Sequence, residues 1–250
     1  MKEWPALPLA LAAALAVVPL PAIAAGVNLS WDACTAEGGV QNKVFACNTN
    51  AGSRAIYGSF VLATNQPNFV GVEITVDFHA QADSLPAWWQ FFNAGSCRAS
   101  ALSVNFVFSD DPRISCTDPW NDQATGGIGS YFTWWTTPQI PSGNANEARL
   151  RIAAAVPSTG PLQLTADTEY YGFKLLVSST KTVGTGSCTG CSTPICITLS
   201  ELNAVQSNNN NQDLTQAVVA NLVTWQSAES CPAGNAAGNV TWGQVRALLH

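Results

Sequence analysis

Apolar and polar residues alternate along much of this chain, and this period of two constrains the fold more than any other feature. From Val70 to Phe78, every second residue is valine, isoleucine or phenylalanine, and the residues between them are glycine or polar. Successive side chains of a β-strand point to opposite faces of a sheet. The pattern therefore predicts a strand over Phe69–Phe78 with one buried face and one solvent-exposed face.

The same alternation recurs in further segments that polar turn clusters separate. The clear ones are Ala101–Phe108, Ala148–Val156, Tyr171–Val177 and Ile195–Leu199, and the weaker ones are Val27–Trp31, Ile56–Leu62, Trp88–Phe92, Tyr131–Trp135 and Ala217–Trp225. About ten short strands, each with one solvent-exposed face, are typical of an antiparallel two-sheet β-sandwich. We therefore expect an all-β fold.

The first 24 residues have the pattern of a secretory signal peptide. Lys2 precedes an apolar run over Leu9–Val18, which is too short to span a bilayer because a spanning helix needs about 20 residues. Residues 22–24 (Ala-Ile-Ala) predict cleavage after Ala24 or Ala25. We expect a secreted protein, extracellular or at the cell surface, with the periplasm as the alternative, and no membrane span after the signal peptide is removed.

All eight cysteines follow the predicted signal peptide. An even number in an exported chain predicts a disulfide framework. The spacing favours two local pairs, Cys34–Cys47 and Cys97–Cys116. Three pairings stay open for the other four, which are Cys188, Cys191, Cys196 and Cys231. Zinc binding by Cys188, Cys191 and Cys196 is the alternative, but no fourth ligand lies close in the sequence.

The length after the signal peptide, about 225 residues, suits one large all-β domain. We expect the β-sandwich over residues 25–206. An Asn-rich exposed loop at residues 207–212 follows, and the segment to residue 250 is expected to pack on the same domain. Thr241 and Gln244 match a capping box, which predicts a short C-terminal helix.

Short motifs along the mature chain carry a family resemblance. They are SWDAC (30–34), FACNTNAGS (45–53), LPAWWQF (85–91), NAGSCR (93–98), TEYYGF (168–173), KTVGTGSCTGCSTPICI (181–197) and TWGQV (241–245). On these motifs the chain resembles a group of uncharacterised exported bacterial proteins with a Cys-rich β-sandwich. That group has no assigned activity, so the resemblance implies no catalytic residues.

A weaker resemblance rests on ARLRIAAAV (148–156), TEYYGFKLLV (168–177) and PICITLSELNAV (194–205). These segments are similar to strands of the cohesin-like sandwich, a protein-docking module, and the resemblance implies a jelly-roll sandwich. The eight cysteines and the many tryptophans depart from that family. Only the fold is therefore carried over, and not dockerin binding.

Few residues suit acid–base or nucleophilic chemistry. The histidines are His79 and the terminal His250, there is no G-x-S-x-G motif, and paired cysteines are not nucleophiles. Four carboxylates cluster in one loop, and they are Asp110, Asp111, Asp118 and Asp122. A calcium site is the favoured functional interpretation of this cluster, because hard cations prefer oxygen ligands. A glycosidase-type carboxylate pair and a solvated loop of Asx turns are the alternatives.

Adjacent tryptophans occur at positions 88–89 and 134–135, and Trp120 lies between the two doublets. Neighbouring residues of a strand face opposite sides, so one tryptophan of each doublet would face outward. Trp89, Trp120 and Trp135 are therefore predicted ligand-binding residues that stack on a sugar ring or anchor a protein partner. The alternative is that loops cover them.

Taken together, these features predict a secreted non-enzymatic binding or structural protein of the cell surface or extracellular matrix. Its expected partner is a protein or a polysaccharide. The net charge of −6 argues against nucleic acid. A carbohydrate-binding module that uses exposed tryptophans is the alternative, and a hydrolase that uses the loop carboxylates is the second. We expect no cofactor other than the calcium considered above.

Overall fold

The computed structural model describes residues 25–92, 96–109, 116–133, 144–157, 159–229 and 231. Within them the chain forms two β-sheets and two short 3-10 helices, η1 (Thr35–Glu37) and η2 (Ala87–Trp89). The strands are β1 (Gly26–Trp31), β2 (Asn42–Lys43), β3 (Ser53–Val61), β4 (Gln66–Ala80), β5 (Leu102–Asn105), β6 (Thr125–Thr133), β7 (Glu147–Ala155), β8 (Leu162–Leu164), β9 (Glu169–Ser178), β10 (Ile195–Gln206), β11 (Gln212–Leu214) and β12 (Leu222–Trp225).

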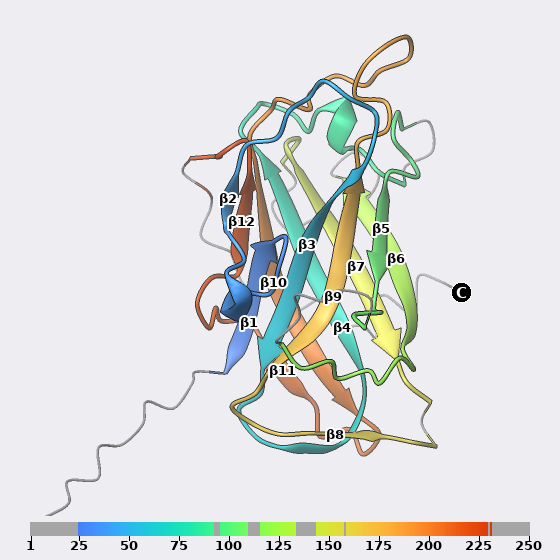
Figure 1. Cartoon of the computed structure of the whole chain (residues 1–250), viewed down its shortest axis with the longest axis vertical. Coiled ribbons are helices and arrows are strands. Elements are labelled where there is room, and N and C mark those ends of the chain that lie inside the picture. Colours follow the sequence, from blue (N-terminus) through green and yellow to red (C-terminus); the bar gives the residue numbers. More distant parts are fainter. Residues whose placement is uncertain are drawn as a thin grey trace, which may run out of the picture.

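The two sheets form a sandwich around one hydrophobic core (Figure 1). The smaller sheet has the strand order β1-β3-β9-β5. The larger sheet has the order β2-β12-β10-β4-β7-β6, with β11 paired to β10 and β8 to β4. Every pairing between named strands is antiparallel except that of β2 with β12. The predicted disulfide-braced all-β sandwich is thus confirmed.

Strand β4 shows how closely the alternation sets the buried face. Its residues Val72, Ile74, Val76 and Phe78 are buried in the core, as predicted. The prediction is wrong at Val70, which is only partly buried, while its neighbour Phe69 is fully buried. The reason is a register shift against β10 at this point, which has the form of a β-bulge and moves the side chains to the opposite face.

The predicted strand over Trp88–Phe92 is wrong, because Trp88 and Trp89 lie in the 3-10 helix η2. Of the predicted strand Tyr131–Trp135, β6 includes the residues up to Thr133, and residues 134–143 lie outside the described part. The predicted signal peptide and the predicted C-terminal helix also lie outside the described part.

No helix among the described residues is long and apolar enough to cross a membrane.

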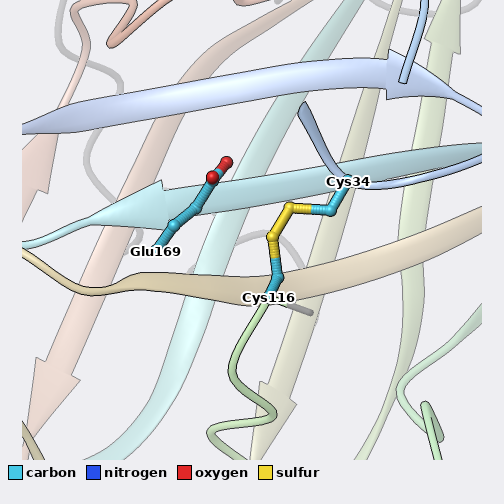
Figure 2. A group of neighbouring side chains, drawn as sticks. All are labelled: Cys34, Cys116 and Glu169. Carbon is cyan, nitrogen blue, oxygen red and sulfur yellow. A yellow bond between two sulfur atoms is a disulfide. The ribbon is translucent and has the colours of Figure 1, made fainter. Parts of the chain in front are cut away.

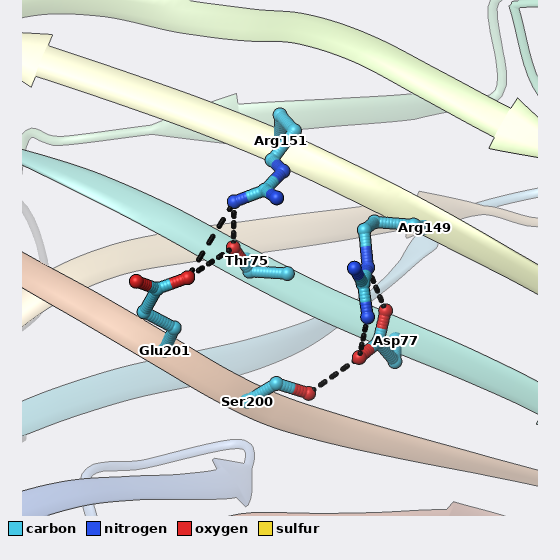
Figure 3. Close-up of polar contacts among 6 residues, drawn as sticks. All are labelled: Thr75, Asp77, Arg149, Arg151, Ser200 and Glu201. Carbon is cyan, nitrogen blue, oxygen red and sulfur yellow. Dashed lines mark hydrogen bonds and ion pairs between the residues drawn. The ribbon is translucent and has the colours of Figure 1, made fainter. Parts of the chain in front are cut away.

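The outer face of the larger sheet is less exposed than the alternation predicts. Arg149 and Arg151 on β7 are only 6% and 5% exposed. Figure 3 shows their guanidinium groups reaching to Asp77 and Thr75 on β4, which also face side chains from β10. Arg149 donates from Nε and Nη2 to the two carboxylate oxygens of Asp77 at 2.6 and 2.9 Å, and Ser200 donates to Asp77 at 2.6 Å. Such two-pronged, charge-assisted pairing offsets part of the cost of burying a cation.

Arg151 continues this polar row on the neighbouring residues of the same strands. It donates to the hydroxyl of Thr75, and its Nη1 lies 3.6 Å from a carboxylate oxygen of Glu201. Burial, together with the neighbouring Arg149, lowers the pKa of Arg151. The face that was expected to be open to solvent is therefore held together by charged groups that cross three strands.

All eight cysteines are paired, as predicted, but the two local pairs are wrong. The bridges are Cys34–Cys116, Cys47–Cys191, Cys97–Cys188 and Cys196–Cys231. Local pairing fails because segments that are close in sequence belong to different sheets, so each cysteine meets a residue from a distant segment. The sequence separations of 82, 144, 91 and 35 residues reflect this arrangement. The zinc alternative is excluded, since its three sulfur atoms are in disulfides.

Removal of the Cys47–Cys191 bridge by a double change to serine is expected to lower the free energy of unfolding by about 2–4 kcal/mol, because a long loop of the unfolded chain is released. Urea unfolding under non-reducing conditions, followed by tryptophan fluorescence, measures this loss. Mass spectrometry of an unreduced digest of the wild-type protein provides the control, since it should detect the four long-range bridges. Detection of a Cys34–Cys47 peptide pair would contradict this arrangement.

Candidate binding pocket

An open pocket of about 490 Å³ lies between the residues around β2 and the start of β3. We call it the Arg54 pocket. It is lined by Asp32, Lys43, Val44, Phe45, Ala46, Ser53, Arg54, Ala55 and Tyr57. Strand β2 is the edge strand of the larger sheet, and β3 lies between β1 and β9 in the smaller one, so the pocket is lined by residues from both sheets.

Local hydrogen bonds fix both walls of this pocket. At Asp32 the backbone takes a left-handed conformation (φ 67°), and its N–H donates to the carbonyl of Ala55 at 3.0 Å. The chain therefore leaves the sheet directly after β1. On the other wall, the side-chain amide of Gln226 accepts from the Phe45 N–H at 3.1 Å and donates to the Phe45 carbonyl at 2.9 Å. Cys47, two residues further on, is tied to Cys191.

Phe45 connects the pocket with the aromatic core. Phe45 is 9% exposed, and its ring stacks on Trp225 with 4.2 Å between the ring centroids. Two cations also lie near this ring: the Nζ atom of Lys43 is 5.5 Å and the guanidinium carbon of Arg54 is 5.3 Å from its centroid. The negative face of an aromatic ring attracts cations, and this attraction helps to hold both side chains at the pocket.

The two cations differ in their other partners. Lys43 forms an ion pair with Asp32. Arg54 has no ion pair or hydrogen bond to its side chain within the described part of the chain, and its Nε atom is buried without an acceptor. A buried N–H donor without an acceptor costs about 1–3 kcal/mol. Of the two cations that line the pocket, Arg54 is the one without an ion-pair partner among the described residues, and it is therefore the candidate anion-binding group.

Of the tryptophans predicted to bind ligands, the two in the described part of the chain do not form a stacking surface. Trp89 in η2 and Trp120 are both fully buried, and Trp120 packs against Phe69 and Phe106. The prediction failed at Trp89 because strand alternation does not apply to a 3-10 helix. Trp135, the remaining predicted residue, lies outside the described residues.

The carboxylate loop is described only in part. Asp118 accepts the N–H of Trp120 at 2.9 Å, which is an Asx turn, and burial raises the pKa of Asp118. Asp122 accepts the hydroxyl of Ser109 at 3.1 Å. Asp110 and Asp111 lie outside the described residues. The calcium site therefore stays a prediction.

One group of potential metal ligands does come together in the described ranges, namely Cys34, Cys116 and Glu169 (Figure 2). The two sulfur atoms form a disulfide, and the Oε1 atom of Glu169 accepts from Asn28 at 2.8 Å and from Ser59 at 2.5 Å. These bonds give every member of the group a structural role. We therefore derive no metal chemistry from it.

His79, the histidine considered as a general base, lies on the outer face of β4. Its Nδ1 atom is 3.2 Å from a carboxylate oxygen of Glu147, the residue opposite it on β7. This cross-strand contact explains the position of His79 without a catalytic role.

Sequence reasoning missed the Arg54 pocket. Lys43, Phe45 and Arg54 match no motif of a known site, and a polar loop separates β2 from β3. The three residues become neighbours only because the two strands join different sheets.

Comparison with models of known protein families and with curated proteins finds no match to this chain. The family resemblances drawn from its motifs therefore stay predictions.

Proposed function

We propose that this chain is a secreted, non-enzymatic binding protein of the cell surface or extracellular matrix, and that it binds a protein partner through the Arg54 pocket. The observation that carries the proposal is the guanidinium of Arg54, which lines an open pocket and has a buried donor without an acceptor. The four disulfides support a location outside the reducing cytoplasm.

The features of the pocket favour a protein partner over a sugar. Sugar rings stack on exposed aromatic faces, but Phe45 is almost covered and already stacked on Trp225. The pocket instead offers cations, strand edges and the exposed side chain of Val44. Its one carboxylate, Asp32, is held by Lys43. This arrangement suits binding rather than proton transfer.

A capture experiment with matched variants tests this function. The mature protein, an Arg54→Ala variant and a Lys181→Ala variant are immobilised and exposed to the exported fraction of the source cells, and retained proteins are identified by mass spectrometry. Lys181 is the control because it is an exposed cation that is not among the residues lining the pocket. We expect one partner to be retained by the wild type and by the control, and at least about tenfold less by Arg54→Ala, since charge-assisted contacts are worth about 1.5–3 kcal/mol.

Equal retention of the partner by all three proteins would exclude the pocket as its site. If no protein is retained specifically by the wild type, the proposed function fails. Thermal unfolding of the three proteins shows whether the substitutions leave the fold intact.

A further inference from the structure

We infer that the ligand of the Arg54 pocket is an extended, acidic segment of a partner protein, which adds as a short strand to the open edge of β3. This inference rests on the function proposed above and names the chemistry of the partner. Three independent features of the described residues carry it: an uncovered strand edge, a second strand edge opposite, and a cation without an ion-pair partner.

The uncovered edge is the start of β3. Strand β1 pairs with β3 only as far as Trp31, which lies opposite Ile56, although β3 begins at Ser53. On its other side β3 is paired with β9 from Ser53 onward. The first three residues of β3 therefore extend past the end of β1, and no strand in the described part of the chain pairs with them on the side of the pocket.

The hydrogen-bond alternation shows which main-chain groups this edge offers. Ser179 donates its N–H to the carbonyl of Gly52 at 2.8 Å, so Gly52 faces β9. In an antiparallel ladder, consecutive residues bond to opposite sides. The main-chain groups of Arg54 therefore face β9, and those of Ser53 and Ala55 face the pocket. The Ala55 carbonyl accepts from Asp32, and the main chain of Ser53 is the group that an added strand would reach first.

The opposite wall provides a second edge and an apolar contact. Strand β2 is the edge strand of the larger sheet, and among the described strands it pairs only with β12. The next residue, Val44, lines the pocket with 73% of its surface exposed. Exposed strand edges attract further strands. Peptides that bind in this way gain affinity from main-chain hydrogen bonds and specificity from alternate side chains.

The charge of the pocket selects an acidic segment. A carboxylate matches the planar fork of a guanidinium better than any other common side-chain group. Among the described residues the guanidinium of Arg54 has no carboxylate partner, while Lys43 is already paired with Asp32. An acidic side chain and a C-terminal carboxylate share this chemistry, so the experiment includes both sources.

The test uses ¹⁵N-labelled mature protein and synthetic peptides whose binding is followed by NMR. The main probe is acetyl-Thr-Glu-Val-Thr-Val-amide. One matched peptide replaces glutamate by glutamine, a second carries N-methyl groups on the main chain, and a third has glutamine with a free C-terminal carboxylate. We expect the glutamate peptide to shift the amide signals of Val44, Ser53 and Ala55. The blocked glutamine peptide and the N-methylated peptide should bind at least about tenfold more weakly, because the first loses the negative charge that pairs with Arg54 and the second loses main-chain N–H donors.

The Arg54→Ala variant should bind the glutamate and glutamine peptides equally weakly, while Lys181→Ala should bind as the wild type does. Tighter binding of the third peptide than of the blocked glutamine peptide would show that a terminal carboxylate also serves, which supports the same chemistry. Unchanged amide dispersion in the variants confirms that they are folded.

Equal binding of the glutamate and blocked glutamine peptides by the wild type would overturn the role of charge. Equal binding of the N-methylated peptide would overturn strand addition. If tri-galacturonate shifts the same amides and the peptides do not, the ligand is an acidic saccharide instead. Partner capture that depends on Arg54, without any peptide binding, would leave the proposed function standing and reject only this inference.

Discussion

Replacement of Arg98 by methionine is expected to lower the free energy of unfolding by about 3–5 kcal/mol, because it leaves buried carbonyl groups without donors. Arg98 is only 2% exposed. Its Nη1 atom donates to the Trp88 carbonyl at 2.7 Å, its Nε atom to the Thr180 carbonyl at 3.1 Å, and its Nη2 atom to the Ser178 carbonyl. One side chain thus joins η2 to the end of β9.

The ring of Trp88 adds to this arrangement. The guanidinium carbon of Arg98 lies 3.4 Å from the ring centroid, a close cation–π contact. Burial lowers the pKa of Arg98 from 12.5 to about 9, so the group is still charged at neutral pH. Between pH 5 and pH 8 we therefore expect no change in stability from this residue. Its folded-state pKa lies below the unfolded value, so stability would rise only above about pH 9.

Urea unfolding followed by tryptophan fluorescence measures the effect of Arg98→Met. Arg98→Lys keeps the positive charge but not the planar fork, so its loss should be intermediate. Lys181→Met removes a cation at an exposed position together with one hydrogen bond, to the Cys97 carbonyl, so this matched control should cost less than about 1 kcal/mol. A loss below about 1 kcal/mol in Arg98→Met would show that the three carbonyls find other donors.

The sequence pattern predicted most of the sandwich because alternation is a local property. Strands β4, β7, β9 and β10 follow directly from apolar residues at every second position. A bulge such as the one beside Phe69 changes the buried face without changing the composition, so the pattern does not reveal it. The same limit applies to η2, where the adjacent tryptophans are both buried because a helical turn, and not a strand, places them.

The long-range features could not be predicted because they depend on which strands become neighbours. Cys34 pairs with Cys116, and not with Cys47, because β1 and β2 belong to different sheets. Arg149 lies on the outer face of the larger sheet and is nevertheless buried, because its side chain pairs with Asp77 on the neighbouring strand β4. Arg54 and Lys43 flank one pocket for the same topological reason. To predict the role of these two cations from the sequence would have required knowledge of the sheet order.

Truncation of Trp225 is the second change with a large expected effect. Trp225→Ala should lower the free energy of unfolding by about 3–5 kcal/mol, because it removes a large side chain from a closely packed core. Trp225 is 2% exposed, and its ring centroid lies 5.0 Å from that of Trp88 and 5.3 Å from that of Trp89. Its indole N–H donates to the Cys191 carbonyl at 2.6 Å.

Trp225 also supports the pocket, because Phe45 stacks on it and the cations of the pocket lie near Phe45. Trp225→Phe keeps an aromatic ring and should remain folded with a loss of about 1–2 kcal/mol, the cost of the lost indole hydrogen bond and of the smaller ring. We expect this variant to bind the glutamate peptide more weakly than the wild type, since Phe45 loses part of its support.

Thermal and urea unfolding measure the two stability changes, and the NMR titration measures the binding. Val219→Ala is the control, because Val219 is 72% exposed and its truncation should be nearly neutral. If Trp225→Phe bound the peptide as tightly as the wild type while losing the expected stability, Phe45 would not depend on the core for its position. The pocket would then be held by Gln226 and the Cys47–Cys191 bridge alone.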